Sequence, residues 1–209
     1  MAPKAEVAVL ALQGDFAAHV RALERAGATA APARTAKEVL SATHLVLPGG
    51  ESTTMLKLLE LDGLDDVLVE FHASGRPILA TCAGVILAAR EVRNPMQRSF
   101  GLLDAVACRN AYGRQLDSFT GPVACPALGE PPLDAVFIRA PVIRWVGPDV
   151  EVLAERETPV LVRQGNLVAA TFHPELTDDV RLHRYFVELA EGVPSGRPSA
   201  MWREAPDAW

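Results

Sequence analysis

The sequence has few cysteines and no long apolar run, and each scarcity excludes a class of protein. Three cysteines, without the spacing of a disulfide framework or a zinc cluster, favour free thiols in a reducing compartment. No apolar run approaches the roughly 20 residues that a membrane-spanning helix needs. The stretch MAPKAEVAVLALQG enters a strand-like run without a cleavage-site pattern. We therefore expect a cytoplasmic protein without a metal site, in which any special cysteine has a chemical role.

The charge pattern argues against polyanionic partners. The formal net charge is -6, and no cluster of Lys or Arg stands out, so neither nucleic acid nor a membrane surface is an expected partner. The 209 residues suffice for one domain with a substantial core. We place this domain at residues 1–191. The remaining tail, residues 192–209, holds three prolines and two tryptophans and is expected to be poorly ordered unless a partner covers it.

Short apolar runs alternate with helical patterns in the first half of the chain. Strands are predicted at residues 7–12, 28–33, 44–47 and 78–80. Helical periodicity fills the intervals between them, and one such helix carries Phe16, Val20 and Leu23 on one face. Continuous apolar strands separated by amphipathic helices are typical of a parallel sheet that is covered on both faces.

The second half has a different pattern. Residues 101–172 show more polar strands and little helical periodicity, which predicts antiparallel strands added to the sheet. The clearest hairpin joins residues 160–164 to residues 167–172 through the Gly-Asn pair at 165–166. A closing helix is predicted to follow Thr177, with that residue as its N-cap.

Cys82 lies in ILATCAGVIL, between an apolar strand and the start of a helix. A cysteine that attacks a carbonyl acts as a thiolate, which is favoured at a helix N-terminus with a histidine in reach. Strand, sharp turn and helix resemble a nucleophile elbow, in which the N–H of the next residue, Ala83, helps to form an oxyanion hole. The alternative is a packing role, because cysteine is among the most buried residue types. Cys108 and Cys125 lack such a turn and are expected to be packing residues.

His173 is the best candidate for a base. It ends the hairpin in TFHPEL, where Pro174 stiffens the chain, so His173 and Glu175 in an extended segment can project to the same side. Glu175 could then hold one ring nitrogen while the other faces a thiol, as the acid of a triad does. The alternative is a strand-end histidine beside a surface glutamate, and only the combination with the elbow favours a triad.

The other four histidines carry weaker signals. His19, His72 and His183 lie in helical patterns and His44 begins a strand, so surface or cap roles are expected for all four.

The segment LPGGEST follows a predicted strand. It lacks the spacing and the lysine of a phosphate-binding loop, so nucleotide binding is not expected. Its glycines instead allow a ligand to approach the backbone closely, and Gly50 could supply a second oxyanion N–H. Arg109 and Arg139 lie at strand ends, where either could pair with a substrate carboxylate or form an ordinary surface ion pair.

Six blocks of the sequence together resemble the triad-type (class I) glutamine amidotransferases. They are LALQGDFAAH, LVLPGGESTTM, TCAGVILAA, RNAYGRQLDSF, VFIRAP and TFHPELTDD. The elbow and the His-Pro-Glu segment are common to that superfamily, whereas the other four blocks are similar to the glutaminase subunits of pyridoxal 5'-phosphate synthase. The resemblance runs from about Val7 to Leu189. It departs from the superfamily pattern at Ala80, where a glycine usually stands.

The resemblance implies an α/β, single-domain, three-layer, flavodoxin-like fold, with a central mostly parallel sheet and antiparallel additions. It implies a catalytic triad of Cys82, His173 and Glu175. The glutamine site and oxyanion donors that it implies are Gly50, Glu51, Ser52, Arg109, Ile138 and Arg139, with the N–H groups of Gly50 and Ala83 facing the oxyanion.

The same resemblance implies an activity and a partner. The chain would hydrolyse L-glutamine to glutamate and ammonia through a cysteine thioester, and would deliver the ammonia to the ring-building synthase subunit in a hetero-oligomer. It would need no cofactor, since pyridoxal phosphate is the product of that partner. Family behaviour further implies weak activity alone and activation by docking near Gly49 and Gly50.

Four alternatives remain at this stage. An α/β-hydrolase would place its acid before the histidine, and Glu175 follows His173. Chaperones or deglycases of related fold commonly have a histidine directly after the nucleophile, where this chain has Ala83. A glutaminase of another pathway shares the triad but not RNAYGRQ and FIRAP. A non-catalytic docking subunit is expected to have lost a triad member, and none is missing.

Overall fold

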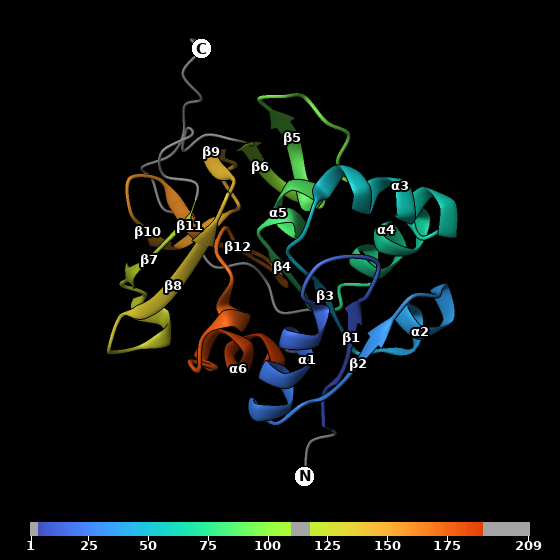
Figure 1. Cartoon of the computed structure of the whole chain (residues 1–209), viewed down its shortest axis with the longest axis horizontal. Coiled ribbons are helices and arrows are strands. Elements are labelled where there is room, and N and C mark those ends of the chain that lie inside the picture. The colour runs from blue at the N-terminus through green and yellow to red at the C-terminus, as the bar shows by residue number, and fades with distance from the viewer. Residues whose placement is uncertain (1–3, 110–117, 190–209) are drawn as a thin grey trace.

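The computed structural model describes residues 4–109 and 118–189 (Figure 1). The tail at 192–209 and residues 110–117, which make up most of the RNAYGRQLDSF block, lie outside the described residues. The domain boundary at residue 191 and the expected disorder of the tail therefore stay predictions.

A seven-stranded sheet forms the centre of the molecule (Figure 1). In spatial order its strands are β10 (Glu151–Glu155), β11 (Pro159–Gln164), β12 (Leu167–Ala170), β4 (Ile78–Thr81), β3 (His44–Leu47), β1 (Glu6–Leu10) and β2 (Thr29–Ala33). The five strands from β12 to β2 are parallel, and β11 and β10 are added antiparallel at one edge. This arrangement confirms the predicted mostly parallel sheet with antiparallel additions.

Helices cover both faces of the sheet, because alternate residues of each strand face opposite layers. On β1, Ala8 and Leu10 join one apolar core, whereas Val7 and Val9 join the other. The first core includes side chains of α2 (Ala36–Ser41), α3 (Ser52–Asp62), α4 (Asp65–Ala73) and α5 (Ala83–Ala88). The second includes side chains of α1 (Phe16–Arg25) and α6 (Arg181–Val187). The three-layer α/β class is confirmed.

Not every strand of the second half joins this sheet, and in this respect the prediction was wrong. β6 (Leu103–Cys108) and β9 (Val142–Val146) form a separate sheet with the earlier strand β5 (Ala89–Arg93), and β7 (Ser118–Val123) pairs only with β8 (Leu133–Ile138). Their buried side chains extend the two apolar cores: β6 and β9 add to the first, β7 and β8 to the second. Alternation in the sequence shows which face of a strand is buried, but not which strand lies beside it.

The predicted hairpin is confirmed, with Gln164 opposite Leu167 and Gly165 at a φ of 57° in the turn. The predicted helix start is wrong, because α6 begins at Arg181 rather than after Thr177. The Thr177 hydroxyl accepts the Asp179 N–H at 3.3 Å, and the Asp179 carboxylate accepts the Arg181 N–H at 3.0 Å. These side chains stabilise local turns, which compete with the helix.

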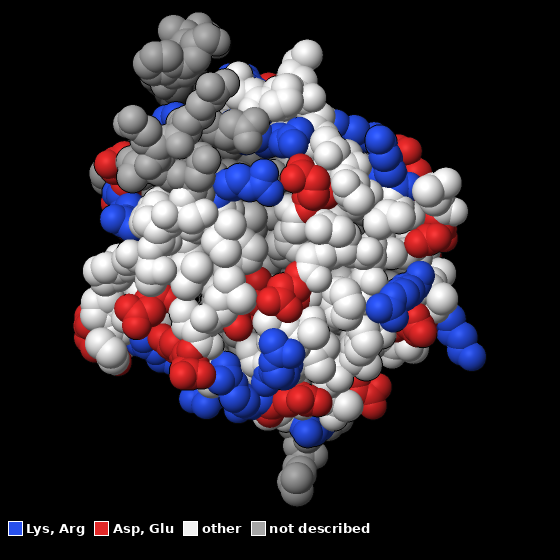
Figure 2. Space-filling model, in the orientation of Figure 1, with Lys and Arg blue, Asp and Glu red and all other residues white. Residues whose placement is uncertain are grey.

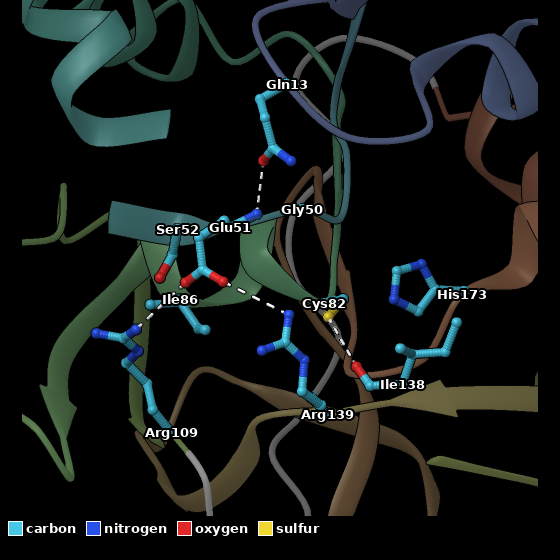
Figure 3. Close-up of a pocket in the computed structure, with 10 residues that line it drawn as sticks. All are labelled: Gln13, Gly50, Glu51, Ser52, Cys82, Ile86, Arg109, Ile138, Arg139 and His173. Atoms are coloured by element: carbon cyan, nitrogen blue, oxygen red, sulfur yellow. Dashed lines mark hydrogen bonds and ion pairs between the residues drawn. The ribbon is translucent and has the colours of Figure 1, made fainter. Parts of the chain in front are cut away.

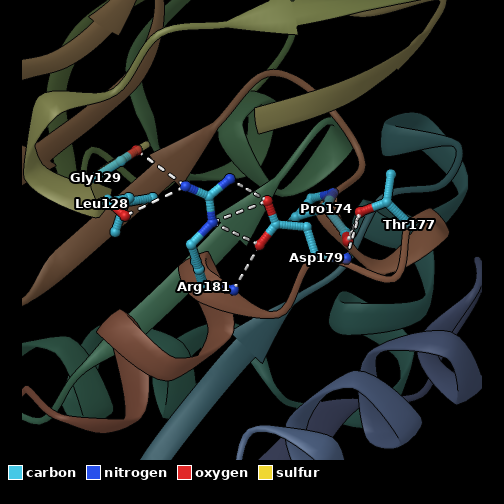
Figure 4. A network of polar contacts seen from close by, with 6 residues as sticks. All are labelled: Leu128, Gly129, Pro174, Thr177, Asp179 and Arg181. Atoms are coloured by element: carbon cyan, nitrogen blue, oxygen red, sulfur yellow. Dashed lines mark hydrogen bonds and ion pairs between the residues drawn. The ribbon is translucent and has the colours of Figure 1, made fainter. Parts of the chain in front are cut away.

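The same turn is held to a distant loop (Figure 4). The Arg181 guanidinium binds Asp179 and donates to the carbonyl oxygen of Gly129 at 2.9 Å, next to the 3-10 helix η1 (Pro126–Leu128). At the start of this turn, the Thr177 hydroxyl donates to the carbonyl oxygen of Pro174 at 3.3 Å. Pro174 opens a second 3-10 helix, η2 (Pro174–Leu176), so the network supports the segment that carries Glu175.

The surface in Figure 2 mixes acidic and basic side chains, and neither sign forms a continuous patch on this face. Over the described ranges, no helix combines the length and the apolar character that crossing a membrane requires.

Candidate active site

Cys82 stands at a sharp turn between β4 and α5, where the parallel strands end. Its φ of 46° and ψ of -104° are unusual for a residue with a side chain. Such a conformation costs about 1–3 kcal/mol and persists only where the surroundings impose it. Here the Cys82 N–H donates to the carbonyl oxygen of Ala170 at 2.9 Å, and the Cys82 carbonyl accepts the Val85 N–H at 3.0 Å. The expected elbow is therefore present.

The small residues around the elbow have separate roles. Ala80, which stands where a glycine is usual, lies fully buried within β4, and the turn forms despite its methyl group. Gly84 is the position that tolerates no side chain, because a Cβ there would overlap the carbonyl oxygen of Leu47 on β3. Close packing of α5 against the sheet therefore depends on Gly84.

His173 and Glu175 make the expected contact by another route. Nδ1 of His173 lies 2.7 Å from Oε1 of Glu175. The segment is not extended, since β12 ends at Ala170 and Glu175 lies in η2, with His173 as its N-cap. Pro174 starts this turn, where its fixed φ and missing N–H are tolerated. The Glu175 side chain is 1% exposed and that of His173 is 11% exposed.

The electrostatics of this pair favour ionised forms. Burial lowers the pKa of His173, but hydrogen bonds with Cys82 and Glu175 outweigh it and raise that pKa to about 10. Burial works against ionisation of Glu175, yet the neighbouring histidines hold its pKa below the usual value. Near pH 7 the pair is therefore an imidazolium beside a carboxylate.

A cavity of about 210 Å³ opens beside Cys82 (Figure 3). This volume lies below the ~300–1,000 Å³ of sites for drug-sized ligands and suits a small metabolite. The Cys82 thiol points toward the carbonyl oxygen of Ile138, 3.8 Å from Sγ. The cavity is lined by Gln13, Gly50, Glu51, Ser52, Cys82, Ile86, Arg109, Ile138, Arg139 and His173.

Three charged side chains meet at the cavity (Figure 3). The Glu51 carboxylate lies between two guanidinium groups, 3.6 Å from Nη2 of Arg109 and 3.5 Å from Nη2 of Arg139. The Arg109 side chain is 14% exposed and the Arg139 side chain 67%. The cavity thus offers both signs of charge, which suits a zwitterionic ligand.

All the residues expected to bind the ligand line this cavity, and so do Cys82 and His173. Glu175 lies behind His173. Ala83 begins α5 directly after Cys82. Ser52 is buried, and its hydroxyl donates to Oε1 of Gln97 at 2.9 Å. The Ala83 N–H is at the first position of α5, where no intrahelical acceptor exists.

Sequence reasoning missed Gln13, Ile86 and the burial of three histidines. Oε1 of Gln13 accepts the Glu51 N–H at 2.6 Å and so fixes the start of α3. Surface or cap roles were expected for His19 and His183, but both are fully buried behind Glu175. His44 is also buried, 7% exposed, with Nε2 3.2 Å from the carbonyl oxygen of Leu189. For these three histidines the prediction of surface or cap roles was wrong.

Comparison with known proteins identifies the family. The model of the SNO glutamine amidotransferase family matches residues 9–192. The chain belongs to this family. The membership confirms the resemblance drawn from the six sequence blocks.

Several known proteins match most of the chain. One is the pyridoxal 5'-phosphate synthase subunit PdxT of Thermotoga maritima, 48% identical over 89% of this chain and 100% of the relative. The subunit of the same name from Solibacter usitatus is 52% identical over 87% of this chain and 97% of the relative. A crystal structure of a glutamine amidotransferase is 47% identical, with a TM-score of 0.82 over 87% of this chain and 97% of that one.

Proposed function

We propose that this chain hydrolyses the side-chain amide of L-glutamine through a thioester on Cys82 and delivers the ammonia to the synthase subunit of pyridoxal 5'-phosphate synthase. Membership of a glutamine amidotransferase family and the printed names of the relatives support the activity and the pathway. The single observation that carries the mechanism is the strained Cys82 elbow, packed beside the His173–Glu175 pair at the cavity.

The charges of the cavity match the two ends of an amino acid. The Arg109 and Arg139 guanidinium groups pair with the α-carboxylate of glutamine, and the Glu51 carboxylate pairs with its α-ammonium group. In the free protein the Glu51 carboxylate pairs with both guanidinium groups, so the substrate exchanges one set of ion pairs for another. Gly50, Ser52 and Ile138 complete the wall, and the side-chain amide then extends toward Cys82.

The first half of the reaction forms the thioester. The Cys82 thiolate attacks the amide carbon, and the N–H groups of Gly50 and Ala83 stabilise the negative charge that develops on the carbonyl oxygen. His173 donates its proton to the departing nitrogen as the C–N bond breaks. Ammonia leaves, and the glutamyl group remains bonded to sulfur.

The second half restores the enzyme. His173, now neutral, takes a proton from water as the water oxygen attacks the thioester carbon. The C–S bond breaks, glutamate leaves, and the thiolate and imidazolium return. Glu175 accepts a hydrogen bond from Nδ1 throughout and so holds the ring in one orientation.

The product explains the need for a partner. In water near neutral pH ammonia is mostly ammonium, which is not nucleophilic, so transfer through a protein interior to the synthase subunit preserves its reactivity. We expect weak hydrolysis by the chain alone and faster hydrolysis in the hetero-oligomer. The three cysteines are unpaired and buried, which fits a cytoplasmic enzyme.

The test is glutamate release from L-glutamine by the purified chain, alone and with an equal amount of a pyridoxal 5'-phosphate synthase ring-building subunit. We expect a low rate alone and a higher rate in the mixture. Equal hydrolysis by the folded chain in the two samples would show that this partner is wrong. Hydrolysis in neither sample would contradict the proposed activity.

A further inference from the structure

Behind the triad acid lies a buried polar cluster that the reaction described above does not use. It consists of His19 on α1, His183 on α6 and Thr81 at the end of β4, and all three side chains are fully buried. Two histidines in an apolar core are costly unless their ring nitrogens have partners. The partners here connect to the active site.

The cluster reaches Glu175 on the side away from His173. Nε2 of His19 lies 3.2 Å from Oε2 of Glu175 and 3.1 Å from the Thr81 hydroxyl oxygen. Nδ1 of His19 lies 3.2 Å from Nε2 of His183. Oε2 of Glu175 has no well-directed hydrogen bond within the part of the chain that is described, so its contact with His19 is a close ion–dipole contact. Each carboxylate oxygen therefore faces a different histidine.

These distances determine where the protons are. Oε2 of an ionised carboxylate only accepts, and a bare ring nitrogen 3.2 Å away would repel it, so Nε2 of His19 carries a proton. Burial lowers the pKa of His19, so its ring is neutral and Nδ1 is an acceptor. Nε2 of His183 must then donate to it. Burial also lowers the pKa of His183, to about 3, which leaves a bare Nδ1 on that ring.

The remaining atom agrees with this assignment. Nδ1 of His183 is buried and has no hydrogen-bond partner within residues 4–109 and 118–189. As a bare acceptor it avoids burying an unpaired N–H. With the opposite tautomers, Nδ1 of His183 would carry a buried N–H without an acceptor. A lone pair on Nε2 of His19 would also face a lone pair on Oε2 of Glu175.

We propose that His19, held in one tautomer by His183, is a positioning residue that keeps the Glu175 carboxylate directed at His173. This inference rests on the proposed function, since it assigns the residue that supports the acid of that same triad. With one oxygen held at His173 and the other at His19, the carboxylate cannot rotate without losing one contact. Thr81 adds a link to the elbow, because the next residue is Cys82.

The proton arrangement is testable without any substitution. Long-range proton–nitrogen NMR spectra of the ¹⁵N-labelled full chain at pH 7 should show His19 and His183 as neutral rings, both protonated at Nε2. His19→Gln and His183→Gln variants assign the signals. A charged His19, or protonation of His19 at Nδ1, would overturn the proposal. This result does not depend on whether the chain hydrolyses glutamine.

The catalytic consequence is testable by two substitutions at one site. His19→Leu removes the Nε2–H that faces Oε2 of Glu175. We expect kcat for glutamine hydrolysis to fall about 10-fold, the lower end of the ~10–100-fold lost when the hydrogen-bond partners behind metal ligands are mutated. KM should not change, since His19 is outside the cavity lining. His19→Gln returns an N–H at a similar reach and should recover most of kcat.

The matched control is His44→Leu. His44 is another buried histidine, which begins β3 and packs edge-on against Phe186. This variant should lose stability but keep kcat. A folded His19→Leu variant with wild-type kcat, or with a changed KM alone, would refute the positioning role. So would an equal loss of kcat in His44→Leu. Should His19→Leu not fold, the NMR spectra and the His19→Gln kinetics decide. An inactive wild-type chain would instead count against the proposed function.

Discussion

Arg109 gives the most quantitative prediction about the substrate. We expect Arg109→Ala to raise the KM for L-glutamine far more than Arg139→Ala does, although each guanidinium lies at a similar distance from Glu51. The difference comes from burial, because the Arg109 side chain is 14% exposed and that of Arg139 is 67% exposed. A charge that is shielded from water interacts more strongly with a carboxylate than an exposed one does.

The expected magnitudes follow from this difference. A hydrogen bond to a charged group contributes about 1.5–3 kcal/mol when buried, which corresponds to a rise in KM of roughly 10- to 150-fold for Arg109→Ala. An exposed ion pair contributes about 0.2–1 kcal/mol, or a rise of roughly 1.5- to 5-fold for Arg139→Ala. In both variants kcat should be nearly unchanged, since neither side chain contacts the reacting amide.

The assay is steady-state glutamate release over a range of glutamine concentrations, in the presence of the synthase subunit. Arg90→Ala is the matched control, because Arg90 pairs with Asp104 on β6 and lies outside the cavity lining. A larger effect for Arg139→Ala than for Arg109→Ala, or a loss of kcat with KM unchanged, would refute the assignment of these groups to the α-carboxylate.

Three further predictions concern the elbow and the triad. Gly84→Ala should lower Tm and activity together, since its Cβ would overlap the Leu47 carbonyl oxygen; thermal melting checks this, and a wild-type Tm would contradict it. Glu175→Gln should lower kcat by up to about 10⁴-fold, as loss of a triad acid does, with little change in KM. The pKa of His173 is raised to about 10 in the folded chain, so protonated His173 contributes to the free energy of unfolding. This contribution is fully present below about pH 6.5 and is lost as the pH rises through 10. Urea unfolding should therefore show the advantage of wild type over His173→Gln shrinking from pH 6.5 to 10, and a growing advantage would contradict the sign.

The elbow could be predicted from sequence because its requirements are local. An apolar strand, small residues on both sides of Cys82 and a helical pattern all lie within ten residues. The His173–Glu175 contact was also predicted from spacing, but its path through η2 was not. Two residues at this separation can meet in a tight turn as well as in an extended strand, and the sequence does not distinguish the two.

The cluster behind Glu175 was missed because the face of α1 was assigned from its large apolar residues, Phe16, Val20 and Leu23. Phe16 and Val20 pack against the core but are only partly buried. The buried residues are Ala18, His19, Ala22 and Leu23, since small side chains allow the helix to approach the strands closely. The helical spacing of His19 with Ala22 and Leu23 was the available signal.

The residues that the sequence could not connect are distant in the chain. His19 contacts His183 across 164 positions, and Gln13 reaches Glu51 across 38. Such contacts depend on the strand order of the sheet, which places the ends of β1, β3, β4 and β12 side by side. Hydrophobic periodicity indicates strands and helices but does not specify that order.

The most direct test of the account is glutamate release by the wild-type chain, Cys82→Ala and Cys108→Ala, each measured with the synthase subunit present. Cys108 is buried and free like Cys82 but lies at the end of β6, outside the cavity lining. The account predicts no release by Cys82→Ala, wild-type release by Cys108→Ala, and an unchanged fold in both. Release of glutamate by folded Cys82→Ala would contradict the thioester mechanism.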